Sequence, residues 1–227
     1  MQRLSELPLL FLLSLCCLLS NGDEEPREAT SNFIMELDIR KAFNTSEVIW
    51  LYKQNYNNTF NGTEDGVLKY HTYTCLSDKR ISLTEGAYNF TQNVRIDGAE
   101  QVFEYYGEFV RNATRTENPP NSLLIYDTGT PDHRHFELMT LVYNSGSYKC
   151  MVFFVYSLYQ MLTDAEVLCE MYIPENAIKN SPPMDCLKFF NRKCAIPPQK
   201  EYQIYFENCT AGAGTEVKPS HENNSVE

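Results

Sequence analysis

The sequence predicts an all-β protein built on an eight-stranded antiparallel up-and-down barrel. Short runs rich in Tyr, Phe and Val follow one another, and turn signals such as Asn61-Gly62, Asp97-Gly98 and Asn144-Ser145-Gly146 separate them. A meander of this kind can close on itself without exposed edges, and it is just wide enough to hold one small ligand. The expected strands are 47–56, 67–75, 87–95, 101–110, 122–126, 136–143, 148–156 and 166–173.

The first 22 residues have the layout of a secretory signal peptide. A short head is followed by an uncharged apolar run at 7–19, which is shorter than the ~20 residues that a membrane-spanning helix needs. We expect cleavage near Gly22. Cys16 and Cys17 then leave with the signal, and six cysteines enter an oxidising compartment.

Seven Asn-x-Ser/Thr acceptors support passage through the secretory pathway, because each used site must lie on the surface. We expect the acceptors at Asn57 and Asn61 to lie in a loop outside the barrel. The full set is Asn44, Asn57, Asn61, Asn89, Asn112, Asn208 and Asn223.

The rest of the chain has the size of one domain. We expect an acidic, flexible leader at 23–32, the domain at 33–210 and a disordered tail at 211–227, where apolar periodicity is absent. The net charge of -11 argues against nucleic acid and anionic membranes as partners, and it is compatible with cationic ligands.

Two helices are expected outside the strand region. Residues 33–43 place Phe33 and Leu37 on one apolar stripe, which indicates a short helix. Residues 182–194 have an acidic residue in the first turn and basic residues in the last, as the helix dipole favours. One more short strand is expected at 202–206.

The strand Val167–Pro174 places one carboxylate among apolar side chains. Because side chains alternate along a strand, Leu168, Glu170 and Tyr172 share one face and Cys169 points the other way. A lone glutamate in a strand usually faces solvent, but both faces here are otherwise apolar. Taken alone, the strand leaves Glu170 facing either solvent or a cavity.

Two short motifs suggest a family. Cys169-Glu170-Met171-Tyr172 resembles the Tyr/Cys-Glu-Leu-Trp signature of the tick salivary lipocalins, the tick histamine-binding protein family. Asp38-Ile39-Arg40-Lys41 is similar to the family's Asp-Ala-Trp-Lys motif. The resemblance spans Asp38 to Cys209. It implies a lipocalin barrel with its floor closed by the N-terminal helix, the C-terminal helix packed outside, and Glu170 inside.

The six remaining cysteines allow fifteen pairings, among which the sequence alone does not choose. The resemblance implies a bridge from the late strands to the C-terminal helix, which agrees with Cys169 facing outward. The implied bridges join Cys75 to Cys209, Cys150 to Cys186 and Cys169 to Cys194.

The resemblance also implies an amine ligand, in which carboxylates meet an ammonium group and aromatic rings enclose it. Glu170 would supply the carboxylate, Tyr172 replaces the signature tryptophan, and Tyr56 matches a pocket tyrosine. The family's other acidic positions carry different residues here, namely Asn44, Thr59 and Met151. A monoamine, or an apolar mediator such as a leukotriene, fatty acid or sterol, therefore stands beside histamine.

We expect a secreted salivary glycoprotein that sequesters a small host inflammatory mediator and so evades host defence. A biogenic amine, serotonin or histamine, is the first expectation, and a lipid mediator is the alternative. A protein-binding immunomodulator such as a complement inhibitor is a third. We expect a monomer with no nucleic-acid or membrane partner.

Catalytic motifs are absent from the sequence: there is no Gly-x-Ser-x-Gly turn, phosphate-binding glycine loop or His-Glu-x-x-His. His133-Arg134-His135 could direct two histidines toward a metal, but no third ligand stands nearby, and we favour a solvated loop edge. We expect no enzyme, no metal and no cofactor.

Overall fold

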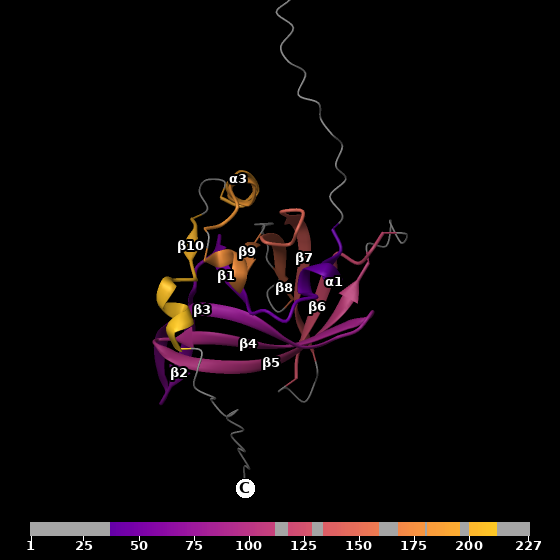
Figure 1. Cartoon of the computed structure of the whole chain (residues 1–227). Helices are drawn as coiled ribbons and strands as arrows, with labels where there is room; N and C mark the ends of the chain where they lie inside the picture. Colours follow the sequence, from indigo (N-terminus) through magenta and orange to yellow (C-terminus); the bar gives the residue numbers. More distant parts are fainter. Residues whose placement is uncertain are drawn as a thin grey trace, which may run out of the picture. The chain divides into compact units, whose positions relative to one another are not determined.

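The computed structural model describes residues 37–111, 118–128, 134–158, 168–179, 181–195 and 200–212. Within these residues eight antiparallel strands close into a barrel, which confirms the predicted lipocalin fold (Figure 1). The barrel strands are β1 (Ile49–Gln54), β3 (Val67–Leu83), β4 (Ala87–Ile96), β5 (Ala99–Val110), β6 (Ser122–Asp127), β7 (His135–Asn144), β8 (Met151–Ser157) and β9 (Leu168–Pro174). Strands β3 to β9 pair in chain order, and β1 pairs with both β9 and β3.

The seam between β1 and β3 is short. In the described chain two residues of β1, Ile49 and Trp50, pair across it. Farther along, the segment after β10 (Tyr202–Gln203) bridges the two strands. The N–H of Ile204 donates to the carbonyl of Tyr52 at 3.1 Å, and the N–H of Cys75 donates to the carbonyl of Ile204 at 2.8 Å. The C-terminal segment therefore completes the wall.

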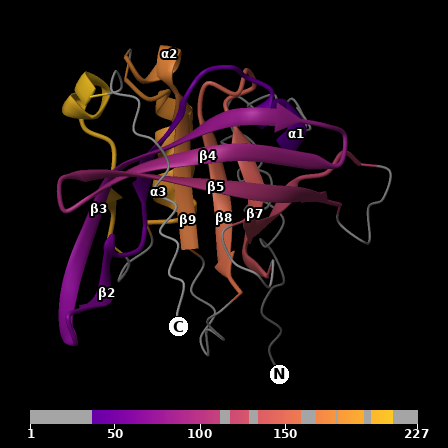
Figure 2. The same ribbon diagram turned by 90° about the horizontal axis from the view of Figure 1, so that it is seen from below.

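The loop expected at Asn61-Gly62 is wrong, because Asn61 lies in a strand, β2 (Thr59–Glu64), opposite Tyr70 of β3. The chain turns at Asp65-Gly66 instead, where φ is 51° and 77°. An Asp-Gly pair in this conformation makes the tight turn that matches the twist of a hairpin. Strand β2 and the start of β3 thus form a hairpin beside the barrel (Figure 2).

Strand β3 continues to Leu83, well past the end expected at residue 75. Its pairing with β4 shifts register between Thr74 and Ser77, which marks a β-bulge. Cys75, inside the bulge, has a φ of 54°. Because a bulge bends a strand without ending it, β3 can serve both the hairpin and the barrel wall.

Helix α1 (Ile39–Phe43) is shorter than the helix expected at 33–43, of which residues 33–36 lie outside the described residues. Asp38 sets its start, because the carboxylate accepts a hydrogen bond from the N–H of Arg40 at 3.0 Å. The Arg40 guanidinium also lies 3.0 Å from Asp38. The expected Asp38 motif is therefore a helix cap.

Helix α3 (Met184–Lys193) packs against the outside of the barrel, as the resemblance implies (Figure 1). A short helix α2 (Glu175–Ile178) precedes it and is labelled in Figure 2. The buried stripe of α3 includes Phe190, which packs with Val152 and Met171 of the barrel wall. The helix begins two residues later than expected, because Pro183 has a ψ of 132° and forms the N-cap, and Pro182 precedes a proline, which disfavours helical geometry.

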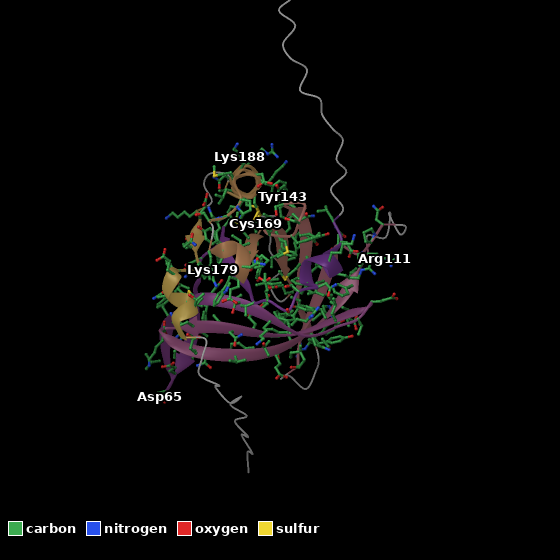
Figure 3. All side chains as sticks on the ribbon, in the orientation of Figure 1. Asp65, Arg111, Tyr143, Cys169, Lys179 and Lys188 are labelled. Atoms are coloured by element: carbon green, nitrogen blue, oxygen red, sulfur yellow. A yellow bond between two sulfur atoms is a disulfide. The ribbon has the colours of Figure 1, made fainter. Side chains whose placement is uncertain are left out.

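Three disulfides fasten these outer parts, and Figure 3 labels Cys169 beneath α3 and Asp65 at the tip of the hairpin. The C-terminal segment is tied to β3, the first turn of α3 is tied to the residue before β8, and the C-cap of α3 is tied to β9. These are the pairs that the resemblance implies. The bridges join Cys75 to Cys209, Cys150 to Cys186 and Cys169 to Cys194.

The expected signal peptide, the leader at 23–32 and the tail from residue 213 onward lie outside the described residues. A 3₁₀ helix at Glu207–Gly212 overlaps the beginning of that expected tail. None of the described helices has both the length and the apolar character needed to cross a bilayer.

Candidate functional site

The interior of the barrel is half filled and half open. Strand β4 shows both halves, because its inward side chains alternate along the strand. Tyr88 and Phe90 are buried in the floor, where Phe43 of α1 stacks on Tyr88 with ring centroids 4.6 Å apart. The next inward residues of β4 line a cavity of about 230 Å³. Its lining residues are Tyr56, Phe60, Tyr73, Leu76, Gln92, Val94, Ile96, Glu137, Glu170 and Tyr172.

Glu170 lies inside the barrel, with 5% of its surface exposed. The alternation predicted for β9 places it there, because Cys169 points outward to its disulfide with α3. The Tyr56 hydroxyl donates a hydrogen bond to Glu170 Oε1. The other oxygen, Oε2, is buried and has no hydrogen-bond partner among the described residues. An unsatisfied carboxylate oxygen in a cavity is costly unless a ligand donates to it.

The pKa of Glu170 is raised, chiefly because burial disfavours the ionised form. The hydroxyls of Tyr56 and Tyr172 partly offset this by stabilising the anion. The two hydroxyls therefore stabilise the ionised carboxylate, and a cation would stabilise it more strongly.

Two further carboxyl groups share this interior, and the sequence did not indicate them. Glu137 of β7 lines the cavity, and burial followed by the negative charge of Glu170 raises its pKa well above the usual value. Asp78 of β3 is 3% exposed and accepts a hydrogen bond from Gln92 Nε2 at 3.1 Å. Burial raises the pKa of Asp78 to about 7. The expectation of one interior carboxylate is therefore incomplete.

A buried glutamine orders the tyrosines. Gln54 lies at the end of β1, directly opposite Glu170 of β9. Its Nε2 donates to the carbonyl of Tyr56 at 2.9 Å and lies 2.7 Å from the Tyr73 hydroxyl. Gln54 thereby fixes both the backbone that carries Tyr56 and the tip of Tyr73 at one side of the cavity.

The structure brings Glu170, Tyr56 and Tyr172 to one cavity, as the resemblance implies. It adds Phe60, which the hairpin carries to the cavity from β2. The sequence feature that could have predicted this hairpin is the Asp65-Gly66 pair, four residues after the sequon asparagine Asn61.

The three positions at which the family's acids are replaced lie outside the cavity lining. Asn44 accepts a hydrogen bond from Arg80 Nη1 at 2.8 Å, and Thr59 Oγ1 lies 3.3 Å from Thr72 Oγ1 on the hairpin. Met151 is fully buried in the floor of the barrel. The barrel interior therefore keeps carboxyl groups, those of Glu170, Glu137 and Asp78, although these three family positions are not acidic here.

Of the two histidines weighed as metal ligands, His133 lies outside the described residues. His135 stands at the start of β7 with its ring edge-on to Tyr126, 5.7 Å between centroids. Across the described ranges, no cluster of three or more His, Cys, Asp or Glu side chains is arranged to hold a metal ion.

Comparisons with known proteins place the chain in a family. The structure of Japanin from Rhipicephalus appendiculatus bound to cholesterol resembles it over 72% of this chain and 96% of that one, at 7% identity and a TM-score of 0.44. The siderocalin Ex-FABP resembles it over 67% and 83%, at 9% identity and a TM-score of 0.39. No curated protein sequence matches. The family model described as tick histamine binding protein matches residues 29–211, and the chain therefore belongs to the tick histamine-binding protein family.

Proposed function

We propose that the protein is a secreted scavenger that holds a small biogenic amine inside its barrel and removes it from the host response. One observation carries this proposal. The buried Oε2 of Glu170 lacks a partner in the described chain, in a cavity whose lining residues include neither Lys, Arg nor His.

An ammonium group fits this environment on physical grounds. It would donate to Glu170 and would also lie near the negative charge of Glu137. The surrounding rings, Tyr56, Tyr73 and Tyr172, can add cation–π attraction, and the hydroxyls of Tyr56 and Tyr73 are held by Glu170 and Gln54. The cavity of about 230 Å³ favours a one- or two-ring amine over a sterol, since pockets for drug-sized ligands span roughly 300–1,000 Å³.

A lipid mediator is the second candidate. It is favoured by the apolar wall that Leu76, Val94 and Ile96 form on one side of the cavity, with Phe60 beside them. Carboxyl groups that stay protonated would tolerate an apolar chain better than ionised ones. This candidate predicts binding that does not depend on the charge of Glu170.

Secretion is supported by the predicted signal peptide, the Asn-x-Ser/Thr acceptors and the three disulfides. The binding site itself consists of carboxyl, phenol, amide and apolar groups. Such a site suits capture of a ligand, and we propose no catalytic role for it.

Isothermal titration of the glycosylated protein with histamine, serotonin and leukotriene B4 tests the proposal. We expect an amine to bind, and Glu170→Gln to weaken that binding about 30-fold or more, which corresponds to roughly 2 kcal/mol for a lost buried charge partner. Glu104→Gln is the matched control, because it removes the same charge from an exposed position of β5. Binding of the lipid alone, unchanged in Glu170→Gln, would favour the second candidate.

A further inference from the structure

Three separate strands bring carboxyl groups toward one cavity inside the barrel. Glu170 comes from β9, Glu137 from β7 and Asp78 from β3. Glu170 and Glu137 line the cavity directly. Asp78 is connected to it through Gln92, which lines the cavity and donates to the Asp78 carboxylate at 3.1 Å.

The other groups around the cavity do not supply a positive charge. The polar side chains that face the carboxyls are the phenols of Tyr56, Tyr73 and Tyr172 and the amide of Gln92. The basic side chains on the strands that line the cavity are engaged elsewhere or exposed. Arg80 donates to Asn44 at 2.8 Å, Lys53 pairs with Glu201 at 2.5 Å, His71 lies 2.7 Å from Asp97, and Arg95 pairs with Glu100 at 2.7 Å. Lys69, Lys79 and His135 are exposed.

Carboxyl groups in this arrangement cannot all be ionised without a cation. Each negative charge is poorly solvated in the barrel and repels the others. The raised pKa of Asp78, about 7, and the raised pKa of Glu137 agree with this geometry. Near neutral pH the empty cavity therefore retains protons that an exposed carboxyl group would have lost.

We propose that the cavity exchanges protons for its cationic ligand: it holds at least one carboxyl proton when empty and releases it to solvent when an ammonium group enters. This inference rests on the proposed amine-binding function and adds its regulation. The entering ammonium supplies the missing positive charge, so the ionised carboxylates become favourable. The proton leaves as the O–H bond of the carboxyl breaks, and the ligand remains a cation throughout.

The exchange makes binding sensitive to pH in one direction. At acidic pH the carboxyl groups are protonated, and protons therefore compete with the ammonium group for the carboxylates. For each proton released, affinity falls by up to tenfold per pH unit, as the pH drops from the carboxyl pKa of the empty cavity toward the lower carboxyl pKa of the occupied one. The ligand is captured near neutral pH and released on acidification.

Titration of the protein with serotonin at pH 7, in phosphate and in Tris, tests the exchange, because these buffers differ in ionisation enthalpy. Serotonin carries its ammonium charge at this pH, so protons that appear on binding come from the protein. We expect the observed enthalpy to change with the buffer in proportion to about one proton released per ligand. We also expect affinity to fall about tenfold or more between pH 7.5 and pH 5.5.

Two variants locate the released proton. Glu137→Gln and Asp78→Asn should each reduce the number of protons released, whereas Glu104→Gln should leave it unchanged. Asp78→Asn keeps the side-chain oxygen that accepts the hydrogen bond from Gln92, so we expect this variant to fold. It therefore still tests the exchange if Glu137→Gln does not fold. Serotonin binding with equal enthalpies in both buffers would overturn the exchange alone. Absence of binding by serotonin and histamine would overturn the amine function itself.

Discussion

Gly107 of β5 lies directly against the Leu123 side chain of the neighbouring strand β6. A Cβ atom at this position would meet Leu123 Cδ1 at 2.7 Å, closer than packed atoms tolerate, and Leu123 is itself fully buried. The absence of a side chain at Gly107 therefore lets Leu123 fill the barrel interior. This is a requirement of packing, not of backbone conformation.

We expect Gly107→Ala to lower the free energy of unfolding by about 1–3 kcal/mol, the usual cost of overpacking a core. Urea unfolding followed by tryptophan fluorescence measures it, since Trp50 is the one tryptophan of the chain. Gly86→Ala is the control, because an added Cβ there meets nothing within 4 Å. Equal losses in the two variants would contradict the packing argument.

At the scale of single residues, the sequence and its resemblance predicted part of the candidate site. Alternation in β9 and the signature motif together predicted Glu170, with Tyr172 on the same face. Asp78 was missed because it lies past the expected end of β3, and its inward direction depends on the bulge between Thr74 and Ser77. Glu137 was missed because which face of β7 points inward depends on pairing with β6 and β8. Those pairings are properties of the closed barrel.

The β2–β3 hairpin combines an exposed apolar face with a sequon. Asn61 is directly opposite Tyr70, so their side chains share one face. Tyr70 is 69% exposed and Leu68, on the same face, is 58% exposed. A sugar attached to Asn61 would lie over this face, and stacking of its apolar side on the Tyr70 ring would shield it.

We therefore expect Asn61 to carry a glycan and to have higher occupancy than Asn57, which has no cross-strand aromatic partner in the described hairpin pairing. Glycopeptide mass spectrometry measures both. Tyr70→Thr should leave the sequon intact while reducing occupancy at Asn61 and not at Asn57. An unglycosylated Asn61 would instead leave the hairpin open to a protein partner.

At the scale of elements, every barrel strand was predicted and β2 was not. The strand pattern is visible where one face is buried, because burial requires alternation. Strand β2 lies outside the barrel, and both its faces are largely exposed or polar, so its composition matches that of a loop. Its clearest trace was the Asp65-Gly66 turn that follows it.

For the molecule as a whole, the buried carboxyl of Asp78 predicts an unusual dependence of stability on pH. The folded pKa of about 7 exceeds the value of about 3.9 in an unfolded chain. Between these values the folded state holds a proton that the unfolded state has lost. The contribution of Asp78 to stability is therefore complete below pH 4 and is lost as the pH rises through 7.

We expect Asp78→Asn to raise the free energy of unfolding at pH 8, on the order of 2–4 kcal/mol, and to change it little at pH 4. The amide cannot ionise and still accepts from Gln92. Thermal unfolding of the ligand-free protein across this pH range measures the difference between the two proteins, which cancels the titration of surface groups. A variant less stable than the wild type at pH 8 would show that the ionised carboxylate is well solvated.

Strand β4 contributes residues both to the barrel floor and to the cavity, so selection for stability acts on one set and selection for ligand binding on the other. Substitutions at Tyr88 or Phe90 disturb the stacked rings of the barrel floor, so selection removes them because the protein no longer folds stably. Changes at Gln92, Val94 and Ile96 alter the shape of an open space and leave those rings in contact. Duplicated genes with this architecture can therefore diverge toward new ligands at three alternate codons of one strand while each copy still folds.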